Sequence, residues 1–116
     1  MSDRREVRVH GTAGNDTPFA MVETASMPWM PTATPGFWRK VLHEDTRSGR
    51  STSLVRIDPG GISPVHSHTA REQIFVIEGT FRDQARTYRA GDFLIREPGA
   101  KHEASSDGGA LLLVVF

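Results

Sequence analysis

The amino-acid sequence predicts an all-β fold, a single small domain built as a sandwich or barrel of short strands. From residue 37 onward, short segments of strand-forming residues alternate with turn signals rich in Gly, Pro, Asp and Ser. No segment between these turns sustains the 3.6-residue apolar period of a helix. A chain of 116 residues has room for one core of moderate size. Many short strands in so small a chain are typical of a closed β architecture.

Composition excludes several classes of function. Hydrophobic residues make up 37% and charged residues 24%, as in a soluble globular protein. The 14 basic and 14 acidic residues cancel, so no overall field favours nucleic acid or a membrane surface as a partner. With no cysteine, any metal must be held by nitrogen and oxygen. We expect a cytoplasmic location, because there is neither a membrane-length apolar run nor a signal peptide.

The first elements of the chain are expected to be irregular. Residues 1–20 are polar and predict an N-terminal arm or edge strand, ahead of a barrel over residues 21–116. The segment 26–38, SMPWMPTATPGFW, contains three prolines, which forbid a helix and favour an extended path or turns. Its apolar side chains, among them Trp29 and Trp38, are expected to cover a hydrophobic surface or to line a ligand pocket.

Nine short strands are expected after this segment. The turns that separate them include DTRSG, DPGG, EGT, AGD, EPGA and SSDGG, all built on residues that favour turns. The predicted strands are 38–44, 52–57, 62–67, 72–78, 80–83, 86–89, 92–96, 102–105 and 110–116.

Two of these strands are apolar on both faces. In 72–78 one face carries Ile74 and Val76 between two glutamates, and the other face carries Phe75 and Ile77; in 110–116 both faces are wholly apolar. The outer face of a small barrel normally contacts water, so something must cover these strands. A homodimer whose interface uses them is the natural expectation.

Histidines and a glutamate are spaced as metal ligands would be. His66 and His68 point to the same face if they lie on one strand, and Glu72 begins the next strand, where its carboxylate can reach the same side. His102 follows a Pro-Gly turn at the start of a later strand. Three imidazoles and a carboxylate suit Fe(II), Mn, Ni, Cu or Zn. Incidental histidines are the alternative, since a single histidine more often packs or caps.

The wider pattern is G-x5-H-x-H-x3-E-x6-G, from Gly60 to Gly79, and a chance match is on the order of 10⁻⁵. It resembles the first motif of the cupin superfamily, whose members are RmlC-like jelly-roll barrels. GDFLIREPGAKH (91–102) resembles the second motif, with departures at Glu97 and Ser106, where that motif has proline and asparagine.

Four further segments look like the ChrR-like branch of cupins, namely EGTFRD (78–83), YRAGDFL (88–94), EPGAKH (97–102) and PGFWRKVL (35–42). That branch includes anti-sigma-factor domains and resembles small dioxygenases that cleave diketones and hydroxyketones. The resemblance covers about residues 35–116 and implies a small double-stranded β-helix, the cupin jelly-roll barrel. It also implies that the metal ligands are His66, His68, Glu72 and His102.

One interpretation is a mononuclear non-haem dioxygenase-like enzyme. One divalent metal ion, with Fe(II) favoured, would bind a small diketone or hydroxyketone through two adjacent oxygens. The expected pocket wall consists of Ile74, Val76 and Phe81, with Trp38 or Trp29 as a lid and Arg56 as a polar anchor. For each wall residue, simple core packing is the alternative.

The other interpretation is a binding or sensor module of the anti-sigma type, in which the same residues close the coordination of Zn(II) without turnover. Sigma-factor binding is expected to be absent, because only about 35 residues precede the recognisable barrel. The complete ligand set argues against a sugar epimerase or isomerase. No serine lies in a G-x-S-x-G context, which disfavours a hydrolase.

Overall fold

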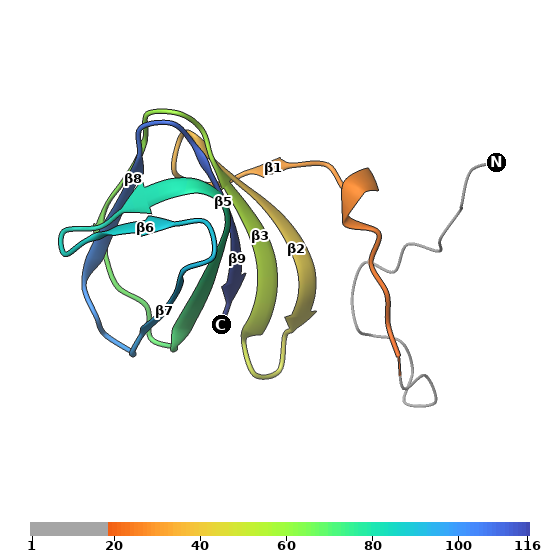
Figure 1. Ribbon diagram of the computed structural model, residues 1–116. Helices are drawn as coiled ribbons and strands as arrows, with labels where there is room; N and C mark the ends of the chain where they lie inside the picture. Colours follow the sequence, from red (N-terminus) through yellow and green to blue (C-terminus); the bar gives the residue numbers. More distant parts are fainter. Residues whose placement is uncertain (1–18) are drawn as a thin grey trace.

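The structure is a computed structural model that describes residues 19–116, and these form an antiparallel sheet curled into a barrel (Figure 1). A short 3-10 helix, η1 (Thr24–Ser26), precedes the strands. The strands are β1 (Met30–Pro31), β2 (Phe37–Asp45), β3 (Arg50–Ile57), β4 (Gly61–His66), β5 (Glu72–Arg82), β6 (Thr87–Arg89), β7 (Phe93–Arg96), β8 (His102–Ser106) and β9 (Ala110–Val115). The predicted all-β fold is confirmed. Within the described part of the chain, no helix has the length and apolar character needed to cross a membrane.

Strand order explains how the sheet encloses a cavity. Along the sheet the order is β1-β2-β3-β9-β5-β8-β4, with β6 and β7 also paired to β5. The first half of β5 pairs with β7 and β9, and its end pairs with β6 and β8. Strand β5 therefore runs from one side of the barrel to the other. The two ends of the order, β1–β2 and β4, remain as the edges of the curled sheet.

The sequence divided β5 at Gly79, whereas the structure has one strand over 72–82. Gly79 adopts φ +74° and the pairing with β9 shifts register between Val76 and Glu78, so the strand bends without ending. The extra residue also changes which side chains face inward. Glu78 was expected on the face of Ile74 and Val76, but it is exposed.

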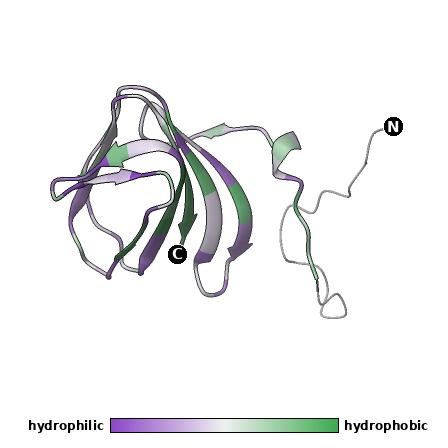
Figure 2. Cartoon of the chain, in the orientation of Figure 1, coloured by the Kyte–Doolittle hydropathy of each residue, from purple (hydrophilic) through white to green (hydrophobic). Residues whose placement is uncertain are grey.

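Alternation along the strands separates an inner and an outer face. The fully buried hydrophobic core consists of inward-facing residues: Ile57, Ile74, Val76, Phe81, Leu94, Ala110, Leu112 and Val114. Figure 2 shows hydrophobic residues along much of β5 and β9. Four large side chains on the outer face of β5 and β7 remain exposed, namely Phe75 (43%), Ile77 (38%), Phe93 (55%) and Ile95 (51%). The second apolar face expected for β5 is thus present.

The proline-rich segment crosses the outer face of β2 and β3. The Trp29 ring lies 4.6 Å from the ammonium of Lys40 and 5.0 Å from the guanidinium of Arg56. Lys40 is buried beneath this segment and donates a 2.8 Å hydrogen bond to the Thr24 carbonyl. Met30, which was expected to be covered, is 56% exposed. The arm predicted for residues 1–20 falls almost entirely outside the described residues and stays a prediction.

Candidate metal centre

Three histidines meet at one end of the barrel. His66 ends β4, His102 begins β8, and the two are direct partners in the antiparallel ladder. His68 lies in the loop that follows β4. The ring centroids are 4.9 Å apart for His66 and His68, 4.3 Å for His66 and His102, and 5.2 Å for His68 and His102. One ring nitrogen from each lies within 4.8 Å of the others, so the three could hold a metal ion.

Backbone carbonyls fix the orientation of two of these rings. His66 Nδ1 lies 2.8 Å from the Pro64 carbonyl oxygen, and His102 Nδ1 lies 3.0 Å from the Ala100 carbonyl oxygen. A carbonyl oxygen can only accept, so each Nδ1 must carry the proton. The lone pair of each neutral ring is then on Nε2. A metal-binding histidine characteristically uses one nitrogen for such a bond and the other for the ion.

Burial favours the uncharged form of two of the imidazoles, those of His68 and His102. It lowers the pKa of His68 below the ordinary histidine value, against the opposing influence of Glu72. It also lowers the pKa of His102, and the positive charge of Arg96 acts in the same direction. A neutral imidazole is the form that binds a metal. The chemistry of the three donors therefore fits a divalent ion at neutral pH.

Glu72 lies beside the histidine cluster. Its side chain is buried at the start of β5, with Oε2 3.8 Å from His68 Nε2 and Oε1 3.6 Å from His102 Nε2. Ligands about 2.1 Å from a common ion are roughly 3–3.5 Å from one another, so both separations are longer than a shared ion requires. The structure brings the three histidines together as a possible metal site and leaves Glu72 beside them. The cross-strand partner of Glu72 is Arg96, whose Nη1 donates to Oε1 at 3.1 Å.

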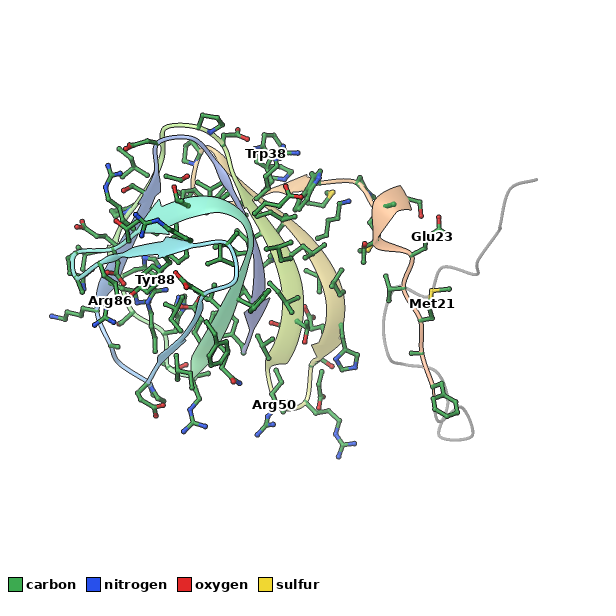
Figure 3. The ribbon with its side chains drawn as sticks, in the orientation of Figure 1. Met21, Glu23, Trp38, Arg50, Arg86 and Tyr88 are labelled. Carbon is green, nitrogen blue, oxygen red and sulfur yellow. The ribbon has the colours of Figure 1, made fainter. Side chains whose placement is uncertain are left out.

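Arg96 connects this carboxylate to a second one. The other terminal nitrogen of its guanidinium, Nη2, lies 3.3 Å from Asp83 Oδ2. Asp83 Oδ2 also accepts a 2.6 Å hydrogen bond from the Tyr88 hydroxyl. Burial opposes the charge on Asp83, but Tyr88, two backbone amides and Arg96 outweigh it and lower its pKa. Burial together with Asp83 raises the pKa of Tyr88 to about 12. Tyr88 lies on β6, where it pairs with Phe81 of β5 (Figure 3). Sequence reasoning did not find Arg96, because its role follows from the pairing of β5 with β7.

A cavity of about 240 Å³ opens next to the histidines. Beyond the three histidines and Glu72, its wall has three parts. The apolar part includes Phe37, Val55, Ile57, Ile74, Phe81, Ala104, Leu112, Val114 and Phe116. The hydroxyl-bearing part consists of Thr32, Thr34, Ser51, Ser53 and Ser63, and the cationic part of Arg39 and Arg96.

The residues expected in the pocket wall are distributed between the inside and the outside of the barrel. Ile74 and Phe81 line the cavity. Val76 is completely buried in the core behind it. Trp38 lies on the outer face of β2 and donates a 2.9 Å hydrogen bond to Asp58 (Figure 3). Arg56 is also on the outer face, because inward positions on β3 alternate with it.

Comparison with known proteins identifies the family. Residues 17–116 match the family model described as the ChrR Cupin-like domain. The chain belongs to the ChrR cupin-like family. No curated protein matches this cupin.

Solved structures with similar folds include proteins of several kinds. ChrR, the anti-sigma factor in complex with SigE from Rhodobacter sphaeroides, has 25% identity and a TM-score of 0.66 over 78% of this chain. A proposed acetylacetone dioxygenase from Methylibium petroleiphilum has 18% identity and a TM-score of 0.79, covering 89% of this chain and 79% of its own. The polyketide cyclase RemF from Streptomyces resistomycificus has 22% identity and a TM-score of 0.71, covering 84% of this chain and 78% of its own.

The similarity to ChrR bears on the expected partners. This cupin spans about half of that protein, 49% of its length. Because an anti-sigma factor bound to its sigma factor is among the similar structures, the exclusion of sigma-factor binding drawn from the short N-terminal region is not upheld.

Proposed function

We propose that this cupin is a mononuclear, metal-dependent dioxygenase-like enzyme that acts on a small molecule with two adjacent chelating oxygens, such as a diketone or hydroxyketone. The observation that supports this most strongly is the three-histidine cluster opening onto an internal cavity of about 240 Å³. A ligand can therefore reach the histidines, whereas a purely structural metal needs no such space.

The proposed ligands are His66, His68, Glu72 and His102. When bound there, a divalent ion, with Fe(II) favoured, would supply Lewis acidity and redox capacity. The protein contributes orientation and exclusion of water. Ile74 and Phe81 form part of an apolar wall against which the carbon skeleton of a substrate can pack.

Metal content and oxygen uptake test this function. Protein purified anaerobically without chelators should contain about one equivalent of metal, and simultaneous His66→Ala and His68→Ala substitution should abolish it. Iron together with oxygen consumption that depends on a diketone or hydroxyketone would support the enzyme. Undiminished metal in the double variant would refute the ligand assignment, and iron without substrate-dependent oxygen uptake would refute the catalytic role.

A second candidate is a metal-dependent sensor without turnover. The observation in its favour is the similarity to ChrR, which was solved in complex with SigE. In this case Zn(II) would be held by all four residues, and coordination would be complete without a substrate. Tightly bound zinc, together with no oxygen uptake, would support the sensor over the enzyme.

We also propose that the protein forms a homodimer through the outer face of β5, β7 and β9. Phe75 pairs with Phe93 on one side and with Leu113 on the other, so these side chains form one continuous apolar row. Phe75 and Phe93 are 43% and 55% exposed, which leaves a hydrophobic surface suited to burial by a second copy. Light scattering at micromolar concentration should give a dimer that Phe93→Glu dissociates. A monomeric wild type would exclude this interface.

A further inference from the structure

The cavity has a polar wall that the metal centre does not use. The inner face of β2 and β3 carries Arg39, Ser51 and Ser53. Between them lie apolar neighbours such as Val55. Ser53 is buried in this wall, Ser51 is partly buried, and Arg39 is exposed at its solvent side. A polar residue buried on the concave face of a small barrel needs a reason, because core packing normally selects apolar residues there.

Ser53 presents its hydroxyl to the cavity. The residue is 5% exposed, and its side chain lines the cavity. Its hydroxyl is not among the buried polar atoms that lack a partner in residues 19–116, so it is open to the cavity. A hydroxyl in that position completes its hydrogen bonds with whatever occupies the cavity, either water or a ligand.

Arg39 is the other unusual member of this wall. Within residues 19–116, Arg39 forms no ion pair with a carboxylate, and the same holds for Arg47, Arg50, Arg86 and Arg89. Of these five arginines, only Arg39 lines the cavity. Protection of a sheet edge does not explain it. The backbone of Arg39 is already covered on both sides, by Met30 of β1 and Val55 of β3. Its charge is therefore available to the cavity.

The polar wall and the metal centre lie on different strands of the curled sheet. Strands β1–β2 and β4 are the two edges of that sheet, and residues from both β2 and β4 line the cavity. His66 lies on the β4 edge and Arg39 on the β2 edge. A small molecule in the cavity therefore meets histidine nitrogens from β4, β8 and the loop after β4, and a guanidinium with hydroxyls from β2 and β3.

We propose that the ligand of this cavity is a small carboxylic acid. Its carboxylate pairs with Arg39 and accepts hydrogen bonds from Ser53 and Ser51, while its oxo or hydroxy oxygens face the three histidines. This rests on the proposed function and narrows the substrate class to diketones or hydroxyketones that carry a carboxylate. A cavity of about 240 Å³ lies below the range of roughly 300–1,000 Å³ that is usual for drug-sized ligands, so the acid is small.

Two probes with the same chelating group isolate the charge. 2,4-Dioxopentanoate and its methyl ester share a diketone and differ in the free carboxylate. Their binding to the metal-loaded protein should be measured anaerobically by calorimetry, and then repeated on protein stripped of metal. The acid should bind about 10-fold or more tightly than the ester, since a hydrogen bond to a charged group contributes at least that factor.

The variants assign this preference to residues. Arg39→Met should reduce the preference for the acid to less than about 3-fold, and Ser53→Ala should weaken binding of the acid more than that of the ester. Arg50→Met removes the same charge from an exposed position that does not line this cavity, and should retain the full preference. Metal content should be unchanged in all three variants.

Equal affinity of acid and ester for the wild type, or a preference that survives Arg39→Met, would overturn the proposal while leaving the metal assignment intact. A wild type that retains no metal would overturn the proposed function instead. The stripped-protein measurement would still show whether Arg39 selects the acid.

Discussion

Replacing Arg96 by methionine should destabilise the metal-free protein by about 3 kcal/mol. The side chains of Arg96, Glu72 and Asp83 are 9%, 9% and 6% exposed, so the substitution leaves two buried carboxylates without their shared cation. Breaking a buried ion pair from one side costs about 3–5 kcal/mol. The lower value applies here, because Asp83 keeps its hydrogen bond from Tyr88 and two from backbone amides. For a domain of this size, the melting temperature should fall by more than about 10 °C.

Circular dichroism during urea and thermal unfolding of the chelator-treated protein measures this loss. Arg71→Met is the matched control, because Arg71 and Glu97 form an ion pair whose side chains are 59% and 64% exposed. That exposed pair should contribute about 1 kcal/mol or less. Added Zn²⁺ should raise the melting temperature of Arg96→Met more than that of the wild type, since the ion then compensates Glu72. A loss for Arg96→Met no larger than that for Arg71→Met would refute the role given to this network.

Two further outcomes are expected. Gly79→Ala should lower the free energy of unfolding by more than about 3 kcal/mol, because residue 79 has a positive φ and a Cβ there would overlap the Gly109 carbonyl oxygen. Gly91→Ala is the control: its φ is also positive but its Cβ would meet open space, so it should cost only about 1–2 kcal/mol of backbone strain. Coinciding urea midpoints for the two variants would contradict this. The stability of the metal-free protein should also decrease as the pH is lowered from about 7 to about 5. The pKa values of His68 and His102 are lowered in the folded state, so in this range the folded protein binds fewer protons than the unfolded chain. Identical urea midpoints at the two pH values would contradict this.

The histidine cluster was the most predictable part of the molecule. The H-x-H spacing predicted that His66 and His68 would share a face if both lay on one strand. Only His66 lies on β4, but both contribute to the cluster. His102 lies 34 residues beyond His68, so no local period could place it beside them. Its position after a Pro-Gly turn made it a candidate, and the resemblance to cupins added it to the ligand set. Arg96 was missed because its role depends on being the cross-strand partner of Glu72, and strand register is set by long-range pairing.

The pocket wall could not be predicted for a similar reason. Inward and outward positions alternate along β2 and β3, and a sequence does not state which set faces inward when both contain apolar residues. Trp38 and Arg56 were assigned to the pocket, yet the inward residues next to them are Phe37 and Val55. The same shift brings Arg39 to the inner face. The bend at Gly79 was mistaken for a turn between two strands, because a glycine at positive φ occurs both in turns and at bends within one strand.

Charge at the metal centre gives an independent reason to expect an anionic ligand. Glu72 and Asp83 bring two negative charges and Arg96 one positive charge, while burial keeps His68 and His102 neutral. The network alone is therefore negative by one charge, and a bound divalent ion would make it positive by one. Without Arg96 the loaded site would be neutral and would favour an uncharged chelator. Arg96 thus biases the loaded cavity toward an anion from the metal side, as Arg39 does from the β2 wall, because opposite charges attract.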